Sequence, residues 1–160
     1  MARRIHVIAL ALVATALMAA CSGGPVRRVS EPAASIQQLA VQPDGSWSVS
    51  LRLQNYSSIP MRFDALDLAL TVGGEEAGRL VDAPALEIGP ESADVIAVGM
   101  QPEPLGRMLL ADALAAGRGV DYALDGTITA APADRGNARS YAVKRRSALS
   151  PAPGLPGVLR

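Results

Sequence analysis

The stretch WSVSLRLQNYSSIPMRFDALDLALTVGG, residues 47–74, contains the pattern from which we predict the fold. Apolar side chains occupy every second position of it twice, at Trp47, Val49, Leu51 and Leu53 and again at Leu66, Leu68, Leu70 and Val72. A period of two is typical of a strand that buries one face. We therefore expect two strands, separated by a break over 55–58, with the second starting near Met61. The pair Gly73-Gly74 predicts a hairpin turn after it.

The same alternation continues on both sides of this stretch. It predicts further strands over 35–41, 76–81 and 93–100, between Val120 and Ile128, and around Tyr141 and Val143. The segment Pro104–Ala116 differs, because its Leu, Met and Ala residues recur at helical spacing and Gly117 follows it. One helix that interrupts strands without alternating with them argues against βαβ units. We expect an all-β, immunoglobulin- or fibronectin-III-like antiparallel β-sandwich with one short helix, over residues 35–149.

The order of these segments resembles the LEA-2 family, also called the water-stress and hypersensitive-response domain. The likeness rests on three pieces: NYSSIPM at 55–61, GGEEAG at 73–78, and YALDG at 122–126 after the short helix. In that family the first piece is Asn-Pro-Asn-x-x-Pro, so Tyr56 and Ser57 depart from it. The resemblance covers residues 35–146. It implies a fibronectin-III-like sandwich, an association with stress or desiccation protection, and no known catalytic residues.

Residues 1–20 have the pattern of a secretory signal peptide. Arg3 and Arg4 precede a run of 16 residues, 5–20, that is nearly all apolar apart from His6. As a helix this run reaches about 24 Å, short of the ~30 Å hydrocarbon core of a bilayer. A short apolar region behind a basic start and before small residues is typical of a cleaved leader. A buried core helix or an uncleaved anchor is the alternative, and we favour the leader because the run has no polar face and Gly-Pro follows it at once.

Cys21 is the single cysteine of the chain, so it has no partner for an intramolecular disulfide. With the leader removed, the chain would hold no His and no second Cys to share a metal with it. The segment 17–21, LMAAC, resembles the lipobox of bacterial lipoproteins. That likeness implies cleavage between Ala20 and Cys21, acylation of the Cys21 thiol, and membrane lipid as a partner. Ser22, where an Asp would suggest inner-membrane retention, favours the outer membrane, facing the periplasm.

Two segments have the composition of flexible chain. Residues 21–34 read as a tether of polar and turn-forming residues, and residues 150–160 as a loosely attached tail rich in Pro and Gly. Arg27 and Arg28 in the tether could touch lipid headgroups, although a solubilising role is the simpler interpretation.

The composition excludes several kinds of function. Aromatic residues are 3% of the chain, and without the leader 13 basic side chains face 15 acidic ones, so we expect no nucleic-acid partner. His6 lies in the leader, which removes a Ser-His-Asp triad. Carboxylate pairs remain candidates by residue type, at Asp64 with Asp67 and at Glu75 with Glu76, and solvated surface charge is the simpler explanation.

Two further segments have a functional and a structural interpretation. The basic run Lys144–Arg146 is interpreted as a solvated strand end, with an anionic lipid or polymer site as the alternative. Asn55 is interpreted as the residue of an Asx turn, with a binding loop as the alternative.

The sequence thus predicts a non-catalytic, lipid-anchored envelope protein without a cofactor, which binds or protects membranes or proteins under dehydration or osmotic stress. The alternatives are an adaptor or assembly factor that pairs with a protein partner through an exposed sheet edge, and an enzyme that uses carboxylates.

Overall fold

A computed structural model describes residues 27–160, which form nine strands and one helix. The elements are β1 (Ala33–Val41), β2 (Trp47–Gln54), β3 (Met61–Val72), β4 (Glu75–Asp82), β5 (Leu86–Ile88), β6 (Ala93–Met100), α2 (Pro104–Ala115), β7 (Val120–Pro132), β8 (Arg139–Leu149) and β9 (Val158–Leu159). The predicted signal peptide and Cys21 lie outside these residues.

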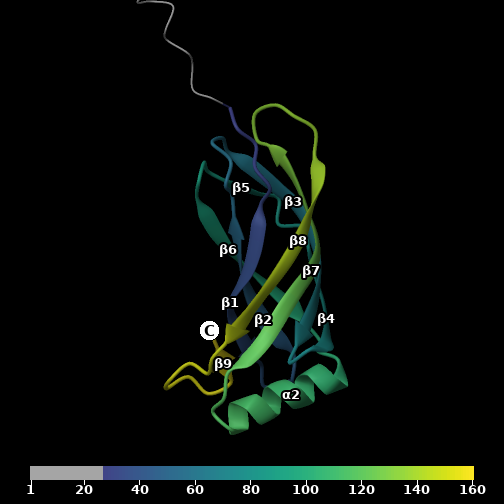
Figure 1. Cartoon of the computed structure of the whole chain (residues 1–160), viewed down its shortest axis with the longest axis vertical. Coiled ribbons are helices and arrows are strands. Elements are labelled where there is room, and N and C mark those ends of the chain that lie inside the picture. Colours follow the sequence, from purple (N-terminus) through teal and green to yellow (C-terminus); the bar gives the residue numbers. More distant parts are fainter. Residues whose placement is uncertain (1–26) are drawn as a thin grey trace, which may run out of the picture.

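The strands form two antiparallel sheets packed face to face (Figure 1). One sheet has the order β6-β2-β1-β9, and the other has the order β4-β3-β7-β8 with β5 paired to the first residues of β3. The chain passes from one sheet to the other between β2 and β3 and between β5 and β6. It does so again between β6 and β7, through α2, and between β8 and β9. The predicted all-β sandwich with one short helix is confirmed for residues 27–160.

The apolar side chains of the period-two pattern fill the space between the two sheets. The alternating residues Trp47, Val49, Leu51, Leu53, Leu66, Leu68, Leu70 and Val72 are all 2% exposed or less. Tyr122 adds a tie between the layers, because its hydroxyl accepts a hydrogen bond from the backbone N–H of Ile36 at 3.1 Å, beside a register shift in β1. Gly126 follows on the same strand, where a Cβ would collide with the carbonyl oxygen of Asp67 on β3. A side chain there would prevent the close pairing of β3 and β7.

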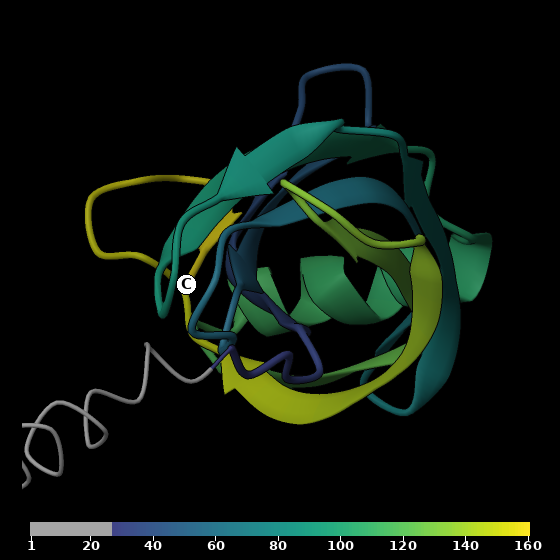
Figure 2. The ribbon, with the colours of Figure 1, turned by 90° about the horizontal axis from the view of Figure 1, so that it is seen from above.

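Helix α2 lies across one end of the sandwich (Figure 1, Figure 2). A register shift makes Ala77 the extra residue of β4, and its carbonyl accepts the N–H of Glu103 at 2.9 Å, just before the helix. Gly106 permits the close approach, since a Cβ there would lie 2.7 Å from the Cβ of Ala77. Gly117, with φ +62°, follows the helix as predicted. Within residues 27–160, no helix has both the length and the apolar character needed to cross a bilayer.

The tail is not loosely attached, contrary to the prediction for residues 150–160. Its end forms β9, which pairs with β1, and Leu159 is fully buried. Ser150 and Arg160 exchange backbone hydrogen bonds at 2.7 and 2.9 Å, and the N–H of Val41 donates to the carbonyl of Gly157 at 2.9 Å. The prediction failed because a single buried leucine and a few backbone pairings are enough to dock a segment whose composition is that of a loop.

Candidate functional site

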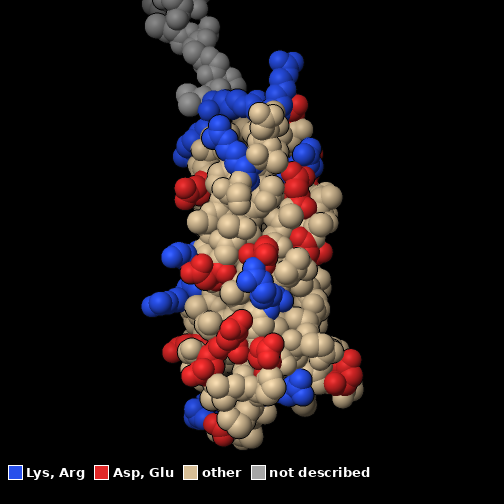
Figure 3. Space-filling view, turned by 90° about the vertical axis from the view of Figure 1, so that its right-hand side faces the viewer, with Lys and Arg blue, Asp and Glu red and all other residues tan. Residues whose placement is uncertain are grey.

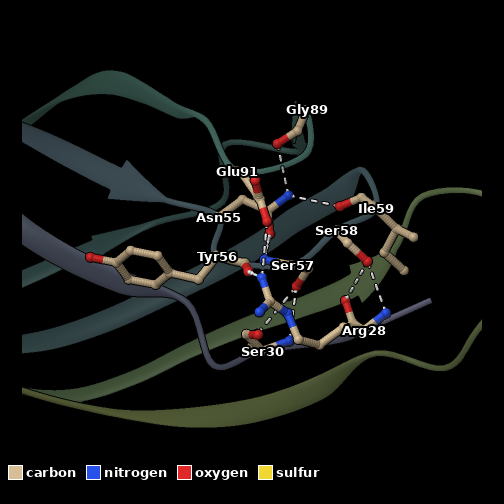
Figure 4. A network of polar contacts seen from close by, with 9 residues as sticks. All are labelled: Arg28, Ser30, Asn55, Tyr56, Ser57, Ser58, Ile59, Gly89 and Glu91. Carbon is tan, nitrogen blue, oxygen red and sulfur yellow. Dashed lines mark hydrogen bonds and ion pairs between the residues drawn. The ribbon is translucent and has the colours of Figure 1, made fainter. Parts of the chain in front are cut away.

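A polar junction at the opposite end of the sandwich from α2 receives the chain from its N-terminal side. We call it the tether-docking junction and define it as Arg28, Ser30, 55–59, Gly89 and Glu91 (Figure 4). It joins the loop between β2 and β3 to the turn between β5 and β6, two of the places where the chain changes sheets. Within residues 27–160, the buried polar side chains are Asn55 and Ser57, and both belong to this junction.

Asn55 is the centre of the junction. Its Nδ2 group donates to the carbonyls of Ile59 at 2.9 Å, Ile88 at 3.1 Å and Gly89 at 2.8 Å. Its Oδ1 accepts the N–H of Ser57 at 2.8 Å, which closes an Asx turn. The structural interpretation of Asn55 is therefore confirmed. Because both ends of the amide are used by backbone groups, the side chain fixes the corner and does not present a binding group.

The tether is docked where the structure describes it, which corrects the prediction of a flexible segment up to residue 34. The N–H of Arg28 donates to the Oγ of Ser58 at 2.9 Å, and the N–H of Ser30 donates to the Oγ of Ser57 at 3.0 Å. The Arg28 guanidinium donates to Glu91 and to the carbonyl of Tyr56, both at 3.0 Å. Strand β1 then begins at Ala33, two residues before the predicted start.

Arg27 attaches the tether to a second loop, 133–138, between β7 and β8. Its guanidinium donates to both carboxylate oxygens of Asp134, at 2.7 and 2.8 Å, and to the carbonyl of Arg135 at 2.8 Å. The hydrogen bond from Arg27, followed by that from the backbone N–H of Arg135, lowers the pKa of Asp134 from 3.8 to about 2. The same contact raises the pKa of Arg27. Sequence reasoning missed this pair, because 107 positions separate the two residues.

The candidate carboxylates do not converge on a common point. Asp64 forms an ion pair with Arg62 of its own strand, and that hydrogen bond raises the pKa of Arg62. Asp67 forms an ion pair with Arg79 across the β3–β4 hairpin. Glu75 and Glu76 are exposed at the start of β4. Within residues 27–160, no group of three or more His, Cys, Asp or Glu side chains could hold a metal ion.

The basic run Lys144–Arg146 lies in the interior of β8, not at a strand end as predicted. It lines one side of a groove of about 1070 Å³, together with β7 residues 121–125 and the Gly73-Gly74 turn. The Nζ of Lys144 lies 3.7 Å from the Oδ2 of Asp125, so the two side chains form an ion pair. Within residues 27–160 β8 pairs with β7 alone, which makes it an exposed edge strand of 11 residues.

The predicted cleavage position at Ala20 and the predicted acylation site at Cys21 lie outside the described residues, so both stay predictions. The described residue nearest to them in the sequence is Arg27, where the described part of the tether begins.

Comparison with known proteins gives no family. No protein-family model matches the chain. No curated protein matches it either. Among solved structures it is similar to a protein from Archaeoglobus fulgidus, with 12% identity over 78% of this chain and 98% of that one and a TM-score of 0.44.

Two further solved structures have similar values. One is a protein from Arabidopsis thaliana determined in solution, with 14% identity, 80% and 82% coverage and a TM-score of 0.45. The other is a target of the Northeast Structural Genomics Consortium, with 14% identity, 81% and 89% coverage and a TM-score of 0.41. No function is assigned from these similarities.

Proposed function

We propose that this protein is a non-catalytic, lipid-anchored envelope protein whose LEA-2-like sandwich binds or protects membranes or proteins under dehydration. One observation supports action by contact: no carboxylate, Lys or Arg side chain in residues 27–160 is buried. Catalytic acids and bases are usually held in partly desolvated clefts that shift their pKa values. Here the shifted groups, such as Asp134, are exposed and owe their shifts to surface hydrogen bonds.

The anchor is tested by metabolic labelling with a clickable fatty acid in the bacterial host. The wild-type chain is expected to take up the label and to sediment with membranes. Cys21→Ala is expected to lose both properties, whereas the matched variant Ser22→Ala keeps both. Labelling of Cys21→Ala would contradict the acylation site.

The protective role is tested by drying and rehydrating a labile test enzyme together with vesicles. The full-length protein is expected to preserve enzyme activity and vesicle contents better than an equal mass of an unrelated soluble protein. Equal losses in the two samples, together with no binding to vesicles, would overturn this part of the proposal.

An adaptor role is the second candidate, and the exposed edge of β8 favours it. A partner strand could add to this edge by backbone hydrogen bonds, with Lys144–Arg146 beside it. A photo-crosslinking residue at position 145 would then capture one stoichiometric partner in cells. The same probe at Val95 on β6, the edge strand of the other sheet, would not. Equal capture from both positions would contradict the adaptor role.

A further inference from the structure

The two ends of the sandwich differ in charge. The tether end, which we define as residues 27–31, 55–60, 89–92 and 133–139, carries four arginines against three carboxylates. The helix end, defined as residues 42–46, 73–76, 101–121 and 150–160, carries three arginines against six carboxylates. Figure 3 shows Lys and Arg side chains crowded at the upper, tether end of the face that it draws, and acidic side chains with further basic ones spread over the rest of that face.

Two arginines of the tether end are not used by the fold. Arg27 and Arg28 form ion pairs with Asp134 and Glu91. In contrast, the guanidinium groups of Arg135 and Arg139 are exposed and have no hydrogen-bond or ion-pair partner within residues 27–160. These two cations therefore remain available to an anionic surface outside the molecule.

The same end also exposes apolar surface. Tyr56 is 53% exposed and Val29 is 43% exposed. Figure 4 shows the ring of Tyr56 pointing away from the tether-docking junction and back along the strands, while its carbonyl accepts a hydrogen bond from Arg28. Aromatic rings with a polar tip are common at the headgroup level of a bilayer, so the exposed ring of Tyr56 suits the rim of such a surface, and Val29 adds apolar area next to Arg28.

Docking of the tether shortens the connection to the predicted anchor. Five residues, 22–26, separate Cys21 from Arg27, so the two Cα atoms lie at most about 22 Å apart, whatever the conformation between them. A tether that stayed free to residue 34 would reach about twice as far. The docked geometry therefore keeps the tether end near the surface to which Cys21 is attached.

We propose that the tether end is a membrane-facing surface, in which Arg135 and Arg139 contact anionic phospholipid headgroups and the helix end is directed away from the bilayer. This inference rests on the proposed acylation of Cys21. Attraction between the arginines and the lipid acts over about 8 Å at physiological ionic strength. The short connection to Cys21 allows the tether end to come that close to the bilayer surface.

The test uses the full-length acylated protein in vesicles that contain phosphatidylglycerol and a headgroup spin label. Acylation blocks the Cys21 thiol, so a fluorophore can be attached to one introduced cysteine. Asn137→Cys reports on the tether end and Ala116→Cys on the helix end, and both positions are exposed. We expect strong quenching of the probe at 137 and weak quenching at 116.

Charge variants identify the cause. On anionic vesicles, some molecules hold the tether end against the bilayer and others do not. Replacing Arg135 or Arg139 by Ala is expected to lower the ratio of the first to the second about fivefold for each arginine. The matched variant Arg145→Ala with Arg146→Ala, which removes two arginines from β8, should leave quenching at 137 unchanged.

Equal quenching at 137 and 116 in a protein that stays on the vesicles would overturn the inference and leave the anchor intact. Quenching at 137 that survives the loss of both arginines and is the same on phosphatidylcholine would overturn the role of the anionic headgroups. A chain that carries no acyl group and leaves the vesicles would overturn the proposed anchor, and the inference with it.

Discussion

The tether and the tail are two segments for which the sequence predicts a flexible chain, and they dock by different interactions. The tether, residues 27–32, is held by hydrogen bonds to the loops 55–58 and 133–138 and by ion pairs to Asp134 and Glu91, and both partners in each ion pair are exposed. The tail, residues 150–160, is held by backbone pairing with β1 and by complete burial of Leu159.

This difference shows which interactions hold each of the two chain segments on the sandwich. Exposed ion pairs are screened by salt and contribute little to stability, whereas a fully buried leucine contributes through the apolar area it removes from water. The tail should therefore behave as part of the core. The tether should behave as a local contact that opens without unfolding the domain.

The largest effect is expected for Leu159→Ala. Loss of a fully buried side chain should lower the free energy of unfolding by about 3 kcal/mol, measured by urea denaturation. Leu155→Ala in the same tail is the matched control, because that side chain is 45% exposed, and a change within about 0.5 kcal/mol is expected. Equal losses for both variants would show that the tail is not held by burial of Leu159.

Asn55→Ala should have the next largest effect. It removes the donor of three backbone carbonyls and the acceptor of the Ser57 N–H, so we expect a loss of about 2 kcal/mol in the free energy of unfolding. The exposed neighbour Tyr56→Ala serves as the control and should change stability little. An unchanged urea midpoint for Asn55→Ala would mean that water replaces the lost hydrogen bonds.

Asp134→Asn should act on the tether alone. The variant weakens the contact with Arg27, so trypsin is expected to cut after Arg27 or Arg28 a few-fold faster, at an unchanged urea midpoint. Asp125→Asn is the control, because it removes the carboxylate of a longer ion pair, at 3.7 Å from Lys144, far from the tether in the sequence. A parallel fall in global stability would show that tether docking is part of the core.

The smallest effect is expected from acid. The pKa of Asp134 is lowered to about 2 in the folded protein, from an ordinary value of 3.8. A lowered pKa means that the contribution of Asp134 to tether docking is complete above pH 3.8 and is lost as the pH falls through about 2. NMR titration of the Asp134 carboxyl should give this midpoint.

The Arg27→Ala variant is the control for the acid titration, and it should move the midpoint of Asp134 upward toward 3.8. An unchanged midpoint would assign the shift to backbone N–H groups, chiefly that of Arg135. No Asp or Glu side chain takes part in the docking of the tail, so the burial of Leu159 should persist over the same range.

Most strands could be predicted because they repeat their pattern locally. The alternation of Trp47, Val49 and Leu51 contains the information that this strand has one buried face, and the same holds for β3 and β7. Helix α2 was predicted within one residue at its end, since helical spacing and Gly117 are local signals too. The Asx turn at Asn55 belongs to the same class, because its partner Ser57 is two residues away.

An antiparallel sandwich, its one described helix and the turn chemistry of its corners could thus be derived from local sequence patterns. The tertiary structure alone decided that the tether and tail dock, that Lys144–Arg146 lies inside an edge strand, and that Arg27 meets Asp134. The reason is physical. Periodicity reports the environment of neighbouring residues, whereas docking depends on surfaces that the folded chain brings together from distant positions.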